Sequence, residues 1–246
     1  MPLLSRPSVH AIAELVLTTE SSQIFQTICQ SLTGLRTLIV YSDEFRFPDA
    51  HKLCKLQTLR LATNTDNPEP QSVYKLLRFI GQIHRLQSLV LENFEVTPFF
   101  LKHLHKVAPK LESLALFDTF RQRSKPLTGD HVASSLNFSN LKAFTLEVDS
   151  INLNSAQLIK LINRCCDILE SIKLKSCTNL KVDKDLLQQM NLAIKALGKE
   201  PIVQASLKDS LLALDQAEDG HLELKSGLLE LSRYSSSRLA VSFSVP

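Results

Sequence analysis

The stretch Cys165-Cys166-Asp167 comes closest to a catalytic pattern in this chain, because a cysteine near a carboxylate can act as a nucleophile. The two cysteines end a segment with the apolar periodicity of an amphipathic helix. In such a position a cysteine usually packs as a small apolar residue. The sequence therefore predicts no catalytic cysteine here.

His103 and His105 are a pair of residues of a metal-binding type. Their i, i+2 spacing on a helix would place the two rings on different faces, which does not suit chelation. The sequence has no Cys-x-x-Cys pair, no serine elbow and no glycine-rich phosphate loop, and six glycines are few for a nucleotide cradle. We therefore predict that the protein is not an enzyme and has no catalytic residue, no metal site and no cofactor.

A motif of the form L-x-x-L-x-L returns along most of the chain, and it must position any functional residue. Its seven copies start 21 to 30 residues apart, which is the period range of leucine-rich repeats. The copies are Ile12–Leu17, Leu35–Val40, Leu56–Leu61, Leu86–Leu91, Leu111–Leu116, Leu141–Leu146 and Leu169–Leu174. We expect an α/β fold, a curved leucine-rich repeat solenoid with a parallel inner sheet and outer helices.

The segments between the motif copies carry helical patterns. Apolar residues at i, i+3, i+4 and i+7 spacing run from Val73 to Ile83. Thr97, followed by a proline, and Asn154 are predicted helix caps.

The third position after each motif copy is polar in regular leucine-rich repeats, because a small polar side chain there satisfies backbone groups of the turn. Asn64, Thr119 and Cys177 follow this rule, whereas Phe94 breaks it. The sequence therefore predicts an irregular array.

The motif disappears after residue 178. We therefore divide the chain into a repeat array at residues 1–178 and a segment at 179–246 that forms degenerate terminal repeats or a C-terminal cap of the same solenoid. Asp183–Leu197 has the pattern of a helix. The rest of this segment leaves two alternatives: strands at Leu211–Leu214 and Leu239–Phe243 with a helix near 221–234, or a hairpin between Leu211–Asp215 and His221–Lys225.

Composition restricts the partners and the compartment. The formal net charge of +3 is too small to indicate nucleic acid or an acidic membrane surface. The sequence shows neither a secretory signal pattern nor an apolar run long enough to span a membrane. The five scattered cysteines favour reduced thiols in the cytoplasm or the nucleus. We therefore expect a protein partner, with no nucleic acid and no membrane.

The residues of each strand that point away from the helices predict where that partner binds. The outward positions form three rows across the concave face of the sheet. The first row is small, and the other two place apolar, aromatic and charged groups on a surface that the fold leaves open. Arg60 beside Glu92 would act as a charged selector, and Lys173 with Lys175 would favour an acidic segment. The predicted partner-binding residues are Ile39, Tyr41, Arg60, Val90, Glu92, Phe117, Lys173 and Lys175.

Two segments, Pro109–Leu116 and Cys166–Cys177, resemble repeats of the F-box leucine-rich repeat proteins, which belong to the ribonuclease-inhibitor-like, cysteine-containing class. The resemblance covers roughly residues 12–178. It implies the substrate-recognition part of a cullin-RING ubiquitin ligase, with a ubiquitin-ligase substrate as the partner. Only 11 residues precede the first motif copy, so no evident F-box comes before it.

The alternative is a leucine-rich repeat regulator outside the ligases, such as a Ran-type GTPase-activating protein. That class uses a rim arginine or asparagine together with an acidic tail. Arg60 and Arg85 could supply the arginine, but residues 235–246 are not acidic.

Overall fold

The computed structural model describes residues 12–63, 73–118, 127–135, 137–165, 170–178, 180–196, 200–203, 221–224, 227–235 and 238–244. The chain forms two compact units, which are described one at a time. Unit 1 is Met1–Phe120 with Phe138–Asn140, and unit 2 is Arg121–Asn137 with Leu141–Pro246. The predicted division at residue 178 stays a prediction. No helix within the described ranges is long and apolar enough to cross a membrane.

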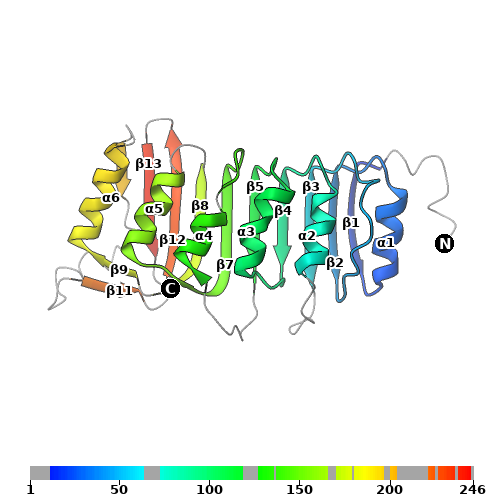
Figure 1. Ribbon diagram of the computed structural model, residues 1–246, viewed down its shortest axis with the longest axis horizontal. Coiled ribbons are helices and arrows are strands. Elements are labelled where there is room, and N and C mark those ends of the chain that lie inside the picture. Colours follow the sequence, from blue (N-terminus) through cyan, green and yellow to red (C-terminus); the bar gives the residue numbers. More distant parts are fainter. Residues whose placement is uncertain are drawn as a thin grey trace. The chain divides into compact units, whose positions relative to one another are not determined.

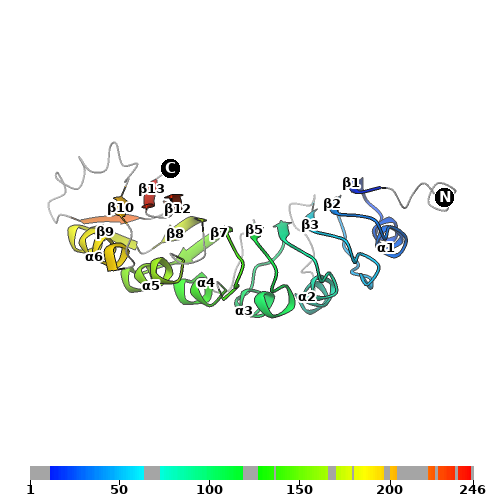
Figure 2. The same cartoon turned by 90° about the horizontal axis from the view of Figure 1, so that it is seen from above.

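Unit 1 is a parallel sheet with helices on one face (Figure 1). Neighbouring strands follow the order of the sequence: β1 (Glu14–Thr19), β2 (Thr37–Ser42), β3 (Thr58–Thr63), β4 (Ser88–Glu92) and β5 (Ser113–Phe117). The helices that return the chain are α1 (Ser22–Ser31), α2 (Val73–Gly81) and α3 (Pro98–Val107). Figure 2 shows all three on the same side of the strands. The predicted α/β fold with one parallel strand per motif copy is thus confirmed.

The motif copies lie in register across the sheet of unit 1. Leu59 pairs with Leu38 on one side and with Leu89 on the other, and Leu89 pairs with Leu114. All four leucines are buried. From β2 to β5 the fourth and sixth residues of each copy therefore form the core, while the residues between them face the opposite side, because side chains alternate along a strand.

Five phenylalanine rings pack together in the core of unit 1. They come from α1, from the segment between β2 and β3, from α2 and from the turn after β4, and they are Phe25, Phe45, Phe47, Phe79 and Phe94. Neighbouring ring centroids lie 5.4 to 6.5 Å apart, a separation at which aromatic rings attract each other. Residues 43–57 form no helix. Two rings from this irregular segment therefore take the place that helix residues take in neighbouring repeats.

The polar position after each strand lies one residue earlier than the motif predicts. Asn93 makes the turn after β4, with φ 59°, a left-handed value that asparagine tolerates better than most residues. Phe94 turns inward to the phenylalanine cluster instead. The equivalent positions in the other repeats of unit 1, two residues after each motif copy, are buried polar residues: Thr19, Ser42, Thr63 and Asp118. Phe94 lies in the core, so it breaks the rule as predicted; Asn64 and Thr119 lie outside the described residues.

Unit 2 continues with parallel strands and then reverses direction. Its first elements are β6 (Leu127–Thr128), α4 (Gly129–Ser135), β7 (Ala143–Asn152), α5 (Ser155–Cys165), β8 (Ser171–Thr178), β9 (Leu180–Asp183) and α6 (Lys184–Ala196). The remaining elements are β10 (Glu200–Val203), β11 (His221–Leu224), β12 (Gly227–Ser235) and β13 (Arg238–Ser244). β7 pairs with β8 in parallel, as predicted. β12 pairs antiparallel with both β8 and β13, and β10 pairs with β13 in parallel.

The C-terminal segment differs in part from the first predicted alternative. The helix at α6 and the strand at β13 are confirmed. The helix expected near 221–234 was wrong, since these residues contribute β11 and β12. β11 pairs with β9, and the other strand of the predicted hairpin, at residues 211–215, lies outside the described part of the chain. β12 alternates leucine with polar residues from Leu229 to Ser232, the two-residue period of a strand.

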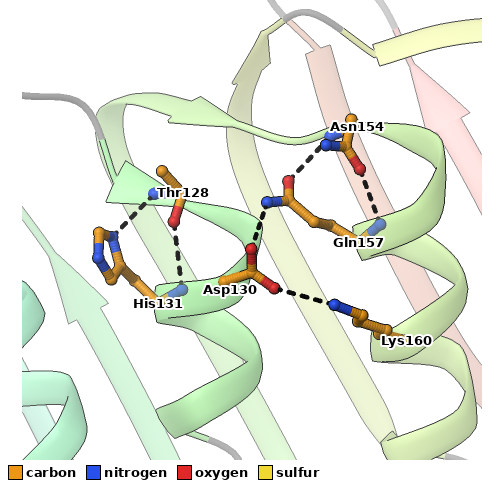
Figure 3. A network of polar contacts seen from close by, with 6 residues as sticks. All are labelled: Thr128, Asp130, His131, Asn154, Gln157 and Lys160. Atoms are coloured by element: carbon orange, nitrogen blue, oxygen red, sulfur yellow. Dashed lines mark hydrogen bonds and ion pairs between the residues drawn. The ribbon is translucent and has the colours of Figure 1, made fainter.

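A polar network joins α4 and α5 near their first turns (Figure 3). Asn154 caps α5, as predicted: its Oδ1 accepts from the backbone N–H of Gln157 at 2.9 Å, and Gln157 Oε1 accepts from the N–H of Asn154 at 3.1 Å. Gln157 also donates to Asp130 on α4 at 2.8 Å. This hydrogen bond, more than the nearby Lys160, lowers the pKa of Asp130. One glutamine thus ties two successive helices together.

Candidate partner-binding surface

The side of the sheet without helices in unit 1, here called the open face, presents three rows of side chains. Strand register sets the rows, and each row takes one residue from each of the five strands. The first row is Glu14, Thr37, Thr58, Ser88 and Ser113; the second is Val16, Ile39, Arg60, Val90 and Ala115; the third is Thr18, Tyr41, Ala62, Glu92 and Phe117. Six of the eight predicted binding residues, all those before residue 120, therefore share one face.

The first and second rows differ in chemistry. Four hydroxyl side chains, all partly exposed, occupy the first row from β2 to β5. The second row is mainly apolar, and its exposure is greatest at Val16, where 65% of the residue is accessible. Ile39 and Val90 are partly exposed on either side of Arg60. A partner could approach the strands over the hydroxyl row and bury apolar groups against the next one.

Arg60 joins the second row to the third. Its Nη2 lies 2.6 Å from Glu92 Oε1 on β4, and its guanidinium carbon lies 5.6 Å from the centre of the Tyr41 ring on β2. The guanidinium therefore makes an ion pair and a cation–π contact at once. The charged selector predicted at Arg60 and Glu92 is a direct ion pair.

Ala62 explains how the guanidinium fits between its two partners. It stands between Tyr41 and Glu92 in the third row, and it is only 4% exposed although it belongs to the open face. The surrounding larger side chains cover it. Arg60 Nε is buried among them and has no hydrogen-bond partner, so the side chain holds its position through Glu92 and Tyr41.

Phe117 extends this group toward β5. It pairs with Glu92 in the strand register and is partly exposed. Its backbone carbonyl accepts from the N–H of Asn93 at 2.7 Å, which fixes the end of β5 beside the turn. Tyr41, Arg60, Glu92 and Phe117 therefore form a continuous aromatic and charged group, here called the Arg60 cluster.

Lys173 and Lys175 belong to unit 2. Lys173 is exposed on β8, where it stands opposite Thr145 on one side and Glu230 on the other. Lys175 pairs with Glu147 in the register, and its side chain lies outside the described part. The structure thus places both lysines on β8, within two residues of each other.

Three of the residues considered for chemistry, Cys165, His103 and His105, lie in the described part of the chain. Cys165 ends α5, and residues 166–169 lie outside the described ranges. The His103 ring stacks on Phe99 at 4.0 Å, whereas His105 meets the edge of Phe138 at 6.1 Å. The two histidines therefore point to different neighbours. Among the described residues, no three histidine, cysteine, aspartate or glutamate side chains could hold a metal together.

The two cysteines whose side chains are described differ in environment. Cys29 is fully buried on α1, and this burial raises the pKa of its thiol to about 12. Cys54 is exposed, and both are free thiols. A thiol with so high a pKa is a poor nucleophile, so Cys29 acts as a core residue.

Sequence reasoning missed two large exposed side chains on the helices of unit 1. Tyr74 on α2 is 69% exposed and Phe99 on α3 is 37% exposed. The helical periodicity gave a partial signal, since neither residue falls on the apolar stripe of its helix.

A shallow depression of about 520 Å³ lies at the ends of β1 and β2 and is lined by Thr18, Thr19, Glu20, Ser21 and Asp43.

Comparison with known proteins adds no relative to this description. No family model matches the chain. No curated protein matches it either.

Proposed function

We propose that this protein is a protein-interaction module that binds its partner through the open face of unit 1. The observation that carries the proposal is the Arg60 cluster, in which a guanidinium is held between an aromatic ring and a carboxylate on an otherwise apolar and hydroxyl-rich sheet. Arginine and tyrosine are the residue types that most often dominate binding energy at protein interfaces.

Folding alone gives little reason for this cluster. Arg60 and Glu92 keep 39% and 23% of their side-chain surface exposed, and an ion pair of that kind contributes about 0–1 kcal/mol to stability. When a partner covers the cluster, water leaves and both polar contacts strengthen. The preformed geometry would also reduce the side-chain entropy that binding removes.

The resemblance of the repeats to F-box leucine-rich repeat proteins supports a more specific proposal, in which the partner is a ubiquitin-ligase substrate. The composition supports the cytoplasm or the nucleus as the site of action, because Cys29 and Cys54 are free thiols. In this proposal the open face selects the substrate, and Arg60 with Glu92 favours a substrate of complementary charge.

Affinity capture from cell lysate with quantitative mass spectrometry tests the proposal. Tyr41→Ala and Phe117→Ala should each release the captured partner while leaving the melting temperature nearly unchanged, because both side chains lie on the open face. Leu192→Ala is the matched control, since Leu192 is 59% exposed on α6 in unit 2. It should retain the partner.

The captured proteins also separate the alternatives. Subunits of a cullin-RING ligase together with a partner that depends on Tyr41 would support substrate recognition. A small GTPase lost in Arg60→Ala would support the Ran-type regulator. Full capture by both open-face variants would overturn the proposed surface.

A further inference from the structure

Three rings, two of them exposed and one partly exposed, follow one another in contact on the helical side of unit 1. Tyr74 near the start of α2 lies 4.8 Å from Phe99 near the start of α3, and Phe99 lies 4.0 Å from His103 one turn further along α3. Figure 1 shows the two helices side by side. His103 Nδ1 lies 2.9 Å from the carbonyl oxygen of Phe99. Since a carbonyl only accepts, this nitrogen carries the proton, and the bond holds the His103 ring over Phe99.

The core does not account for these rings. The inward face of α2 is complete with Leu76, Leu77, Phe79 and Ile80, and that of α3 with Phe100, Leu101 and Leu104, all of them buried. Tyr74 and Phe99 instead pack on each other and remain exposed. Aromatic side chains left in water beside each other are a frequent sign of a binding surface.

The two helices that carry the rings have a positive net charge. Neither α2 nor α3 contains an acidic residue. Lys102 and Lys106 follow Phe99 at i+3 and i+7, so they lie along the same face of α3, and Lys75 adjoins Tyr74. These three lysines are exposed and form no ion pair within the described residues. Arg78 has a partial partner, with its Nη2 3.6 Å from Asp49 Oδ1.

We propose that Tyr74, Phe99 and His103 with Lys75, Lys102 and Lys106 form a second docking surface, which binds an acidic protein segment carrying an apolar or aromatic side chain. The rings receive the apolar group, and the lysines receive the carboxylates. The surface lies on the opposite side of the sheet from the Arg60 cluster (Figure 2). Unit 1 could then hold two proteins at once, one on each face.

A protein segment fits this surface better than nucleic acid does. Three lysines without ion-pair partners on two short helices give a small charge, whereas nucleic-acid affinity depends on neutralising many phosphates. Phe99 in contact with both Tyr74 and His103 also forms a compact hydrophobic anchor site, whereas single-strand binders place separate rings along a basic groove.

The test uses the full chain and a short synthetic peptide in which glutamates flank phenylalanine, labelled for fluorescence anisotropy. Two further probes are the same peptide with glutamine in place of glutamate and a single-stranded oligonucleotide of equal charge. We expect the glutamate peptide to bind at low salt, and its affinity to fall in about 0.3 M salt, where charge interactions are screened. The glutamine peptide should bind at least about tenfold more weakly, since it lacks the charge.

The variants separate the rings from the charges. Tyr74→Ala with Phe99→Ala, and separately Lys102→Glu with Lys106→Glu, should each weaken glutamate-peptide binding by at least about tenfold, whereas Tyr74→Phe should retain it. Tyr41→Ala should also retain it, so that failure here is distinguishable from failure of the open face. Circular dichroism verifies that each variant is folded, and Lys102→Glu with Lys106→Glu still tests the surface if the ring variant is not.

Four results would overturn the proposal. They are no binding of the glutamate peptide by the wild-type chain, equal binding of the glutamine peptide, tighter binding of the oligonucleotide, and conversion of a dimer to a monomer by Tyr74→Ala in analytical ultracentrifugation. The last result would assign the rings to a second copy of this chain.

Discussion

Thr63 and Asn93 exchange hydrogen bonds at the ends of two neighbouring strands. Thr63 Oγ1 donates to the backbone carbonyl of Asn93 at 3.1 Å, and Asn93 Nδ2 donates to the backbone carbonyl of Thr63 at 2.8 Å. The backbone N–H of Asn93 donates in turn to Phe117 at 2.7 Å. One asparagine thus connects the ends of β3, β4 and β5, beside the Arg60 cluster.

Asn93→Ala should lower the free energy of unfolding by about 1–3 kcal/mol, because the carbonyl of Thr63 loses its partner and alanine is strained at a positive φ. Urea denaturation followed by circular dichroism measures the change. Asn93→Gly is the matched control, since glycine adopts this φ without strain. It should recover part of the loss, and equal stability of Asn93→Ala and the wild type would contradict the assigned role.

Leu114→Ala should destabilise the protein by about 2–5 kcal/mol, as expected for truncating a buried leucine. Leu114 is 1% exposed in the centre of β5. Leu192→Ala, at an exposed position of α6, should change the unfolding free energy by less than about 0.5 kcal/mol. Thermal and urea unfolding of both variants measure the difference, and a wild-type melting temperature for Leu114→Ala would show that this leucine is outside the core.

Gly129→Ala should destabilise unit 2, because a Cβ on this residue would lie 2.6 Å from Leu153 Cδ1 and 2.7 Å from Gln157 Cβ. The clash would push α4 away from α5 and stretch the hydrogen bond from Gln157 to Asp130. Gly81→Ala offers a comparison, since its Cβ would lie 3.3 Å from Val107 Cβ and alanine also favours helix. We expect a lower melting temperature for Gly129→Ala than for Gly81→Ala, and the reverse order would contradict the close approach.

Cys29 should resist alkylation in the native protein. With a pKa of about 12, only about one thiol in ten thousand would be ionised at pH 8 even if reagent could enter the core. Cys54 is exposed, so it should be labelled much faster than Cys29. Iodoacetamide labelling with peptide mass spectrometry gives both rates. Similar rates at the two cysteines would mean that α1 opens readily.

Stability should fall in mildly acidic solution partly because of His105. Burial, followed by the charge of Lys106 and by His103, lowers the pKa of His105, and its Nδ1 is buried without a hydrogen-bond partner. The unfolded chain therefore binds a proton at a higher pH than the folded one does, so stability declines as the pH drops below the ordinary histidine pKa of about 6.5. His105→Gln should flatten this decline in urea unfolding measured from pH 7.5 down to 5; an unchanged slope would exclude His105.

The leucine motif predicts the fold of unit 1 because each copy repeats the same burial pattern. A spacing of two residues fixes which side chains enter the core, so the register of Leu38, Leu59 and Leu89 followed from the sequence. The turns were less predictable. Asn93 and Phe94 are adjacent, and only the packing of Phe94 against Phe45 determines which of them turns inward.

The secondary structure of the C-terminal segment was also hard to predict from the sequence. Gly227–Ser235 contains enough leucine for either a helix or a strand, and its partners β8 and β13 determine the outcome. Long-range pairing of this kind leaves a weak local signal.

The candidate surface was predictable where strand alternation applies. The contact between Arg60 and Glu92 follows from neighbouring rows on neighbouring strands. The position of Arg60 over Tyr41 also depends on the small size of Ala62, which no single-strand pattern reveals. Tyr74 and Phe99 come together only because α2 and α3 pack side by side.

The phenylalanine cluster limits how far this array can be rearranged. Solenoid repeats are often exchangeable cassettes that can be deleted, duplicated or replaced by a consensus unit. Here Phe45 and Phe47, from a repeat without a helix, pack against Phe25 of one flanking repeat, and Phe47 also packs against Phe79 of the other. Phe25 and Phe79 also contact each other, at 5.6 Å. Replacing that repeat with a helical consensus unit would place a helix where Phe45 and Phe47 now lie. Deleting the repeat would remove the two rings against which Phe25 and Phe79 pack. We therefore expect the repeats of β1 to β4 to be kept together as one unit in evolution, recombination or engineering.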